Sequence, residues 1–215
     1  MLIVGAKGFA KEVLEILHQL NQLDNLVFYD DVYSDLPALL YDKFPILTDL
    51  EEAKNYFATI SNQFTIGIGN PILRKRLFEK FTGIGGEFTS VISPFAQIGH
   101  YDNKIESGAN IMTGTVITND VSIGKGALIN LNCSIGHNVI IGDFVEISPS
   151  VSVSGNCKIG NYSNLGTNAT ILPKVSIGTN VIVGAGSVVT KDVPDNCLVV
   201  GIPAVLKKAL QPIEF

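Results

Sequence analysis

The stretch INLNCSIGHNVIIGDFVEIS, residues 129–148, decides the fold, because an aliphatic residue returns at every sixth position. The spacing runs without interruption through Ile105, Ile111, Ile117, Ile123, Ile129, Ile135, Ile141, Ile147, Val153, Ile159, Leu165, Ile171, Ile177, Val183 and Val189. A period of six fits neither an α-helix nor an alternating strand, whereas hexapeptide repeats of a parallel β-helix have it. The sequence therefore predicts a left-handed parallel β-helix.

Three consecutive hexads would form one triangular coil of this β-helix, and coils would stack at about 4.8 Å, the usual strand spacing. Each aliphatic residue would point inward. Four positions later a small or β-branched residue follows, and Cys133 and Cys157 are two examples that we expect to be buried. This domain is predicted to occupy residues 87–215 and to end in a short C-terminal tail.

Residues 1–86 show a different pattern, in which apolar strands alternate with segments of helical spacing. The expected strands are LIV, LVFYDD and FTIGIGN, and the expected helices are KEVLEILHQL, DLEEAKNYF and ILRKRLFEKF. Such alternation predicts a parallel sheet flanked by helices. The expected fold class is therefore α/β plus β, with a small Rossmann-like domain before the β-helix.

Bulk composition excludes several classes of protein. The chain has 215 residues, a net charge of −5 and no cluster of Lys and Arg, so we expect no nucleic-acid partner. No apolar run approaches the roughly 18 residues of a membrane helix, and the start lacks a signal-peptide pattern. Three cysteines without a CxxC pair predict neither a disulfide framework nor a metal site. We expect a cytoplasmic protein without membrane contact.

His137 is the residue in the repeats that calls for a chemical explanation. It stands at the third place of its hexad, which lies at a corner and points outward, and Gly155 follows 18 residues later, directly above it. An ordinary polar turn residue is one interpretation. The other is a general base beside a backbone amide, because an imidazole changes protonation near neutral pH. We expect His18 and His100 to be surface or packing residues.

Three motifs resemble one known family: GAKGFAKEV at the start, IGHNVIIGDFVEIS in the middle and VVGIPA near the end. They are similar to the sialic acid O-acetyltransferase-like family, whose members include N-acetyltransferases of nucleotide-linked amino sugars of the bacillosamine, perosamine and viosamine type. The resemblance implies transfer of an acetyl group from acetyl-CoA, without a metal, to the amino group of a nucleotide-linked 4-amino-4,6-dideoxy sugar.

The resemblance also implies roles for residues of the repeats. His137 matches the general base, and Asn138 replaces the acidic neighbour that is usual in the family. Asn130 matches a contact to the sugar. Positions that match the cofactor site are Glu146, which is often histidine in the family, Gly155, whose amide faces the thioester carbonyl, and Thr167 and Ala185, which line the pantetheine channel.

The first domain is predicted to hold the nucleotide. Lys7, Gly8 and Phe9 lie in a strand-to-helix turn whose N–H groups suit a pyrophosphate. Asp30, Asp31 and Gly69 end two further strands, at the edge where open parallel sheets bind ligands. Two solvated acids opening a loop are the alternative for the aspartates. Arg74 and Arg76 are expected at the surface.

The expected oligomeric state and the alternative functions also follow from the sequence and the resemblance. The resemblance implies a homotrimer with active sites between subunits. Candidates for the coenzyme A phosphates are Lys174, Lys191, Lys207 and Lys208. O-acetylation of sialic acid or another free sugar stays open, and so does a noncatalytic scaffold. A β-helix hydratase of the γ-carbonic anhydrase type needs three histidines around zinc, and the repeats contain only two.

Overall fold

A computed structural model describes residues 1–33 and 35–214. The chain forms two compact units, Met1–Val91 and Ile92–Phe215, whereas the sequence analysis put the boundary after residue 86. Across the described residues, no helix combines the length and the apolar character that crossing a membrane requires.

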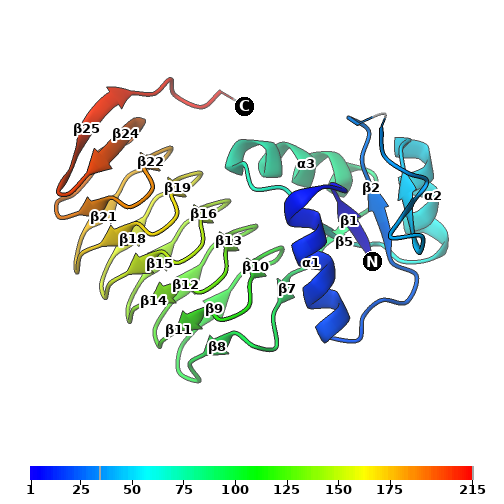
Figure 1. Cartoon of the computed structure of the whole chain (residues 1–215), viewed down its shortest axis with the longest axis horizontal. Coiled ribbons are helices and arrows are strands. Elements are labelled where there is room, and N and C mark those ends of the chain that lie inside the picture. Colours follow the sequence, from blue (N-terminus) through cyan, green and yellow to red (C-terminus); the bar gives the residue numbers. More distant parts are fainter. Residues whose placement is uncertain (34, 215) are drawn as a thin grey trace. The chain divides into compact units, whose positions relative to one another are not determined.

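The first unit is a mainly parallel sheet with strand order β3-β4-β2-β1-β5-β6 (Figure 1). Its strands are β1 (Leu2–Val4), β2 (Val27–Tyr29), β3 (Leu39–Leu40), β4 (Phe44–Leu47), β5 (Gln63–Ile66) and β6 (Glu87–Phe88), and its helices are α1 (Gly8–Gln19), α2 (Leu50–Thr59) and α3 (Pro71–Gly83). The three predicted strands and three predicted helices are all present. The short antiparallel pairing of β3 with β4 was not predicted, because LL and FPIL are too short to show a period.

Local sequence explains where these helices begin and which face they bury. Helix α1 buries the apolar face that carries Val13, Leu14 and Leu17. Helix α2 begins with a capping box, in which Asp49 and Glu52 satisfy each other's backbone N–H groups. Helix α3 begins with an Asn70 cap and Pro71 in its first turn, a position where proline loses no helical hydrogen bond.

The second unit is the predicted parallel β-helix (Figure 1). Its first sheet contains β7 (Val91–Ile92), β10 (Asn110–Ile111), β13 (Leu128–Ile129), β16 (Glu146–Ile147), β19 (Asn164–Leu165), β22 (Ile182–Val183), β24 (Cys197–Gly201) and β25 (Ala204–Ala209). The second contains β8 (Gln97–Ile98), β11 (Val116–Ile117), β14 (Ser134–Ile135), β17 (Ser152–Val153), β20 (Thr170–Ile171) and β23 (Val188–Val189). The third contains β9 (Lys104–Ile105), β12 (Ser122–Ile123), β15 (Ile140–Ile141), β18 (Lys158–Ile159) and β21 (Ser176–Ile177).

The register confirms that residues 18 apart stack on one another. Ile117 pairs with Ile135, and Ile135 pairs with Val153. The aliphatic residues of the repeat and the small residues between them form one continuous core, in which Cys133 and Cys157 are buried as predicted. The position of a residue in the sequence therefore fixes the coil and the corner of the β-helix on which it lies.

The C-terminal end differs from the prediction. Residues 197–209 do not form a short tail but the antiparallel hairpin of β24 and β25, and β24 continues the first sheet by pairing with β22. The hexad pattern ends before this segment, so periodicity alone did not indicate it. The hairpin covers the last coil, although β25 itself is largely exposed.

Candidate functional site

The β-helix has three corners, and two of them carry predicted site residues. We call the residues that follow β11, β14, β17, β20 and β23 the histidine corner: Asn119, His137, Gly155, Pro173 and Lys191. We call those that follow β13, β16, β19 and β22 the channel corner: Leu131, Pro149, Thr167 and Ala185. The strand registers stack the members of each corner one coil apart.

His137 is exposed on its corner, as predicted, and its ring is held in one orientation. Its Nδ1 lies 2.8 Å from Oδ1 of Asn138. An amide oxygen can only accept, so Nδ1 carries the proton and Nε2 keeps its lone pair. Asn138 has a left-handed backbone (φ 59°), which asparagine tolerates better than most residues. Asn138 therefore orients the imidazole with a neutral acceptor instead of a carboxylate.

The imidazole lies directly against Gly155. A Cβ atom at position 155 would be 2.6 Å from Nε2 and 2.8 Å from Cε1 of His137, closer than side-chain contacts allow. Any side chain at position 155 would therefore push the imidazole out of this position. The stacking of His137 below Gly155, which the 18-residue spacing predicts, is confirmed.

The N–H of Gly155 has no acceptor among the residues that the structure describes. At other corner positions, such as Tyr101 and Asp143, a side-chain oxygen one coil higher accepts the equivalent N–H: Asn119 accepts from Tyr101 at 3.2 Å, and Asn161 accepts from Asp143 at 2.8 Å. Pro173, one coil above Gly155, offers no such oxygen. The free N–H beside a histidine can therefore stabilise an oxygen that gains negative charge.

A shallow groove runs along the sheet face next to this corner. It measures about 230 Å³, and its lining is rich in hydroxyl groups, contributed by Thr118, Ser134, Ser152 and Ser154. The hydroxyl oxygens of Ser134 and Ser152 lie 3.1 Å apart. These short polar side chains leave room for an extended ligand beside His137.

The other predicted site residues of the β-helix do not lie on the histidine corner. Thr167 and Ala185 are exposed and stack on the channel corner. Asn130 precedes that corner, and its Oδ1 accepts the N–H of Leu131 at 2.7 Å. Glu146 lies on β16 and accepts from Asn164 at 2.7 Å. One chain therefore does not bring these residues to His137.

In the first unit, a pocket of about 160 Å³ opens at the carboxyl ends of β1, β2 and β5, the edge where the nucleotide is predicted. Its lining includes Gly5, Tyr29, Asp31, Tyr33 and Ile68. The sequence analysis missed both tyrosines as site residues. Aromatic and aliphatic walls with a carboxylate at the mouth suit a flat heterocycle that also carries N–H donors.

The two predicted aspartates have different roles. Asp30 is buried and accepts the N–H groups of Ala6 at 3.1 Å and Val32 at 3.1 Å, so it ties the first turn to the end of β2. Asp31 is half-exposed and binds Lys80 at 2.7 Å. Partial burial acts to raise the pKa of Asp31, but hydrogen bonds from Lys80 and Tyr29 outweigh it and hold the pKa below its ordinary value. Asp31 is thus an ionised acceptor at neutral pH.

The turn before α1 is open for an anion. Lys7 precedes the helix without a side-chain cap, and the first turn, which holds Gly8 and Phe9, contains no acidic residue. Its N–H groups and the helix dipole therefore favour a negative ligand. The Lys7 ammonium lies 3.5 Å from the ring centroid of Tyr33 and 3.3 Å from a carboxylate oxygen of Asp35.

Arg74 contradicts the prediction of a surface residue. It is 1% exposed, and its guanidinium donates to the carbonyl oxygen of Gly69, the predicted ligand-binding glycine. An arginine in the first turn of α3 can reach back to the loop before the helix, so burial follows from that contact rather than from an apolar pattern. Among the described residues, no group of three His, Cys, Asp or Glu side chains is placed to hold a metal ion.

Known families match both units. Residues 1–81 match the PglD N-terminal domain, and residues 156–191 match the bacterial transferase hexapeptide repeats. The whole chain is similar to the solved structure of PerB from Caulobacter crescentus in complex with CoA and GDP-perosamine, with 30% identity, 96% coverage of each chain and a TM-score of 0.88.

Two further solved structures are similar over the same length. WeeI from Acinetobacter baumannii AYE has 30% identity and a TM-score of 0.86, with 96% of this chain and 98% of that chain covered. The acetyltransferase domain of PglB from Neisseria gonorrhoeae FA1090 has 28% identity, the same coverage and a TM-score of 0.87.

Proposed function

The chain belongs to the hexapeptide-repeat N-acetyltransferases with a PglD-type N-terminal domain, and from this premise we propose that it acetylates the amino group of a nucleotide-linked 4-amino-4,6-dideoxy sugar. Acetyl-CoA supplies the acetyl group. The observation that carries the proposal is an oriented imidazole, His137, packed on a glycine whose N–H has no acceptor in the described chain. A relative of similar sequence and fold binds both CoA and GDP-perosamine.

In the proposed reaction, His137 acts as the general base. Its Nε2 takes a proton from the sugar amine as the nitrogen attacks the thioester carbonyl carbon. Asn138 accepts from Nδ1 throughout, so the lone pair that receives the proton is the one on Nε2. A new C–N bond forms, and the C–S bond then breaks.

Gly155 stabilises the intermediate of this reaction. Its N–H donates to the carbonyl oxygen, which carries negative charge in the tetrahedral state. As the intermediate collapses, the electron pair goes to the sulfur, and the proton held by His137 returns to the departing thiolate. The products are the N-acetylated sugar nucleotide and free CoA, so atoms and charge balance.

The nucleotide is proposed to bind the first unit. The open turn at Lys7, Gly8 and Phe9 takes the pyrophosphate, and the pocket that contains Asp31 and Tyr33 takes the base. Asp30 lines the same pocket, and it also holds the turn in place, because both its oxygens accept backbone N–H groups.

We also propose that the enzyme is a homotrimer. Within one chain, His137 and the channel corner occupy different edges of the prism. If the channel corner of one copy faces the histidine corner of the next, Thr167 and Ala185 line the site of a neighbour. Light scattering coupled to gel filtration tests this, and a monomeric active enzyme would refute it.

The test of the reaction uses purified protein, acetyl-CoA and a panel of UDP-, dTDP- and GDP-linked 4-amino sugars. Thiol release and a product with an added acetyl group are expected with at least one amino sugar of the panel. His137→Ala should lower kcat by about 10²-fold or more. Turnover only with a free hydroxyl sugar would favour the O-acetyltransferase alternative, and an unchanged His137→Ala variant would end the enzymatic proposal.

A further inference from the structure

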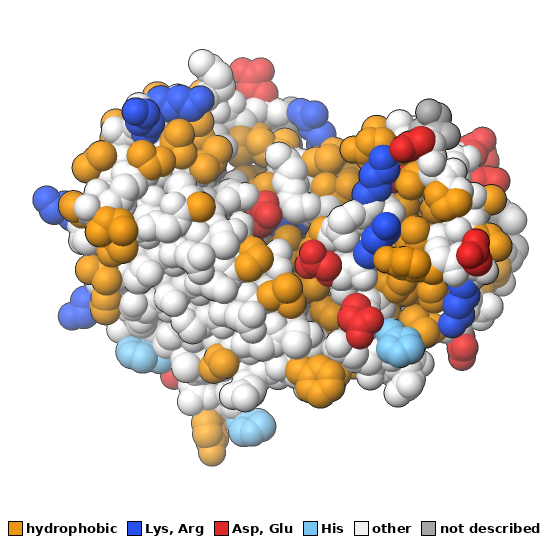
Figure 2. Space-filling view, viewed as in Figure 1, with side chains coloured by type: hydrophobic (Ala, Val, Ile, Leu, Met, Phe, Trp, Pro, Cys, Tyr) orange, Lys and Arg blue, Asp and Glu red, His pale blue; other side chains and the backbone are white. Residues whose placement is uncertain are grey.

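Resting on the proposed function, we infer that the first unit selects a uracil or thymine nucleotide over a guanine nucleotide, because Lys80 and Tyr29 leave Asp31 a single free acceptor oxygen for the base. The phosphates cannot make this choice, since every candidate substrate carries the same diphosphate. Figure 2 shows acidic and basic side chains interspersed with hydrophobic ones over the visible face of the first unit, so no field of one sign distinguishes the substrates either. The choice therefore falls to the groups that face the base.

The two oxygens of the Asp31 carboxylate differ in their partners. Oδ2 accepts from the ammonium of Lys80 at 2.7 Å and from the hydroxyl of Tyr29 at 2.9 Å. The Lys80 ammonium also donates to the Tyr29 hydroxyl at 3.3 Å, so the three groups hold one another. No other residue that the structure describes donates to Oδ1. Asp31 therefore offers one acceptor oxygen, Oδ1, to a ligand in the pocket.

The two donors to Oδ2 are held by the packing of a strand and a helix. Tyr29 is the last residue of β2, is buried, and packs edge-on against Phe81 of α3 with 4.9 Å between the ring centroids. Lys80 lies in the last turn of α3, and its ammonium is 5.1 Å from the centroid of the Tyr29 ring. Hydrogen bonds between charged groups are stronger than neutral ones. We therefore expect Oδ2 to stay occupied when a base enters.

The bases differ in the donors on their pairing edge. Uracil and thymine present one N–H between two carbonyl oxygens, so a single acceptor oxygen satisfies it. Guanine presents two neighbouring N–H donors, which a carboxylate accepts with both oxygens side by side. With Oδ2 of Asp31 occupied, one guanine donor stays unpaired in the pocket, and an unpaired buried donor weakens binding. Adenine and cytosine would direct the lone pair of a ring nitrogen at the carboxylate.

The rest of the pocket offers guanine no second free carboxylate oxygen. Among the described lining residues, the only other carboxylate is that of Asp30, and both its oxygens accept backbone N–H groups. Tyr33 forms a flat wall, and the Lys7 ammonium lies 3.5 Å from the centroid of its ring. The remaining side chains of the lining are aliphatic or belong to the Asp31 cluster: Val4, Tyr29, Val32, Ile68, Leu73 and Leu77.

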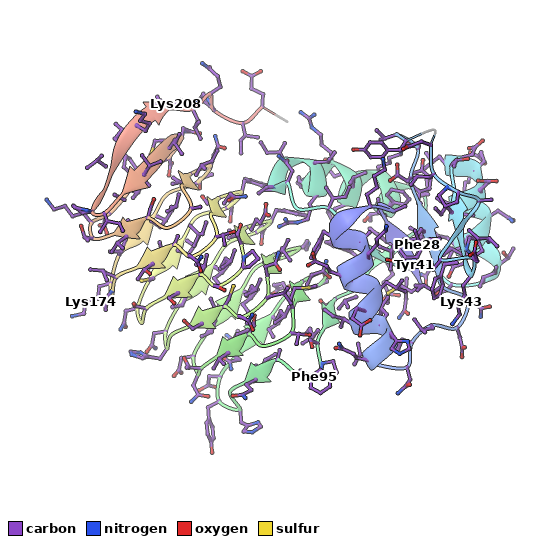
Figure 3. The ribbon with its side chains drawn as sticks, in the orientation of Figure 1. Phe28, Tyr41, Lys43, Phe95, Lys174 and Lys208 are labelled. Atoms are coloured by element: carbon purple, nitrogen blue, oxygen red, sulfur yellow. The ribbon has the colours of Figure 1, made fainter. Side chains whose placement is uncertain are left out.

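A second pocket of the first unit is the alternative place for the base. It contains Lys11, Tyr41 and Lys43 and shares no lining residue with the pocket of Asp31 (Figure 3 labels Tyr41 and Lys43). The pocket of Asp31 includes Gly5, which lies just before the turn proposed for the pyrophosphate. The second pocket instead follows later turns of α1. The pocket of Asp31 is therefore the better match for a base joined to that pyrophosphate.

The experiment measures the binding of free nucleoside diphosphates to the full-length protein by calorimetry. UDP should bind about tenfold more tightly than GDP, and inosine diphosphate, which lacks only the exocyclic amino group of guanine, about fivefold more tightly than GDP. UDP methylated at N3 of its ring has no N–H for Asp31 and should lose most of its affinity. Equal affinities of GDP and inosine diphosphate, or GDP bound as tightly as UDP, would overturn the inference.

Variants test the two donors directly. The Lys80→Met, Tyr29→Phe double variant frees Oδ2 of Asp31, so the preference for UDP over GDP should fall to about threefold or less. Lys75→Met is the matched control, because Lys75 pairs with Glu79 on the same helix, and it should keep the wild-type preference. Tyr41→Leu should leave all affinities unchanged. A loss of UDP affinity in Tyr41→Leu, or an unchanged preference in the folded double variant, would overturn the inference. The nucleotide series on the wild-type protein decides the matter if the double variant does not fold.

Activity separates this inference from the proposed function. Acetylation of a GDP-linked amino sugar in preference to the UDP- and dTDP-linked ones would overturn the inference and support the proposed function. Selective binding of UDP without acetylation of any amino sugar would refute the proposed function and leave the inference standing.

Discussion

Replacing Gly155 by alanine tests the central contact of the proposed site. A Cβ at position 155 would lie 2.6 Å from Nε2 of His137, and ordinary contact begins at 3.4 Å, so the ring must move by about 0.8 Å. A misplacement of about 1 Å in a reacting group lowers rates by about 10²-fold. That factor corresponds to about 2.7 kcal/mol of transition-state stabilisation. We therefore expect kcat of Gly155→Ala to fall about 100-fold.

The Gly155→Ala variant should lose activity but keep nearly the same free energy of unfolding as wild type. Gly155 is outside the left-handed backbone region, so alanine is tolerated there, and its effect on the free energy of unfolding should stay within about 1 kcal/mol. The assay is steady-state thiol release, with urea unfolding as the check of the fold. The double variant with His137→Ala is the control, because without the imidazole the added methyl group has nothing to displace. A folded Gly155→Ala variant with wild-type kcat, or an equal additional loss in the double variant, would refute the reasoning.

Further predictions concern the support of the base, an ion pair and the core. Asn138→Asp places a carboxylate beside Nδ1 of His137, which favours the protonated ring, so the acidic limb of the pH–rate profile should move to higher pH. A profile that does not move would contradict a direct contact. Lys80→Met should lower stability at pH 7 by less than about 1 kcal/mol, because its partner Asp31 is partly exposed. Since the pKa of Asp31 is lowered in the folded state, this contribution is present above about pH 4 and is lost as pH falls further, so the two proteins should converge in acid denaturation. Ile147→Ala removes a fully buried core side chain and should lower the free energy of unfolding by about 2–5 kcal/mol, measured in urea.

The reactivity of the three cysteines tests whether their side chains point into the core. All three are buried, and burial raises the pKa of the Cys133 thiol to about 11. The native protein should therefore react slowly with a thiol reagent at pH 8, and denaturation should make the thiols available. Fast reaction of the folded protein would contradict the inward position of Cys133.

Several features of the site depended on contacts that no local pattern reports. Arg74 is buried through a bond to Gly69, and Lys80 pairs with Asp31, which is 49 residues away along the chain. Asp30, predicted as a ligand contact, also accepts the backbone N–H groups of Ala6 and Val32, an additional role that its place at the end of a strand did not indicate. In each case, a side chain found its partner through the packing of separate elements.

The sequence by itself determined the β-helix, its core and the stacking of Gly155 on His137, because a strict hexad converts position along the chain into position in space. It also determined the parallel sheet of the first unit through the alternation of strands and helices. Only the tertiary structure decided that Asn138 turns its oxygen toward the imidazole, and that Arg74 is buried with its guanidinium on the carbonyl oxygen of Gly69. The physical reason is that periodicity reports which side of the backbone a residue faces, whereas hydrogen bonds and pockets depend on where side chains from distant parts of the chain meet.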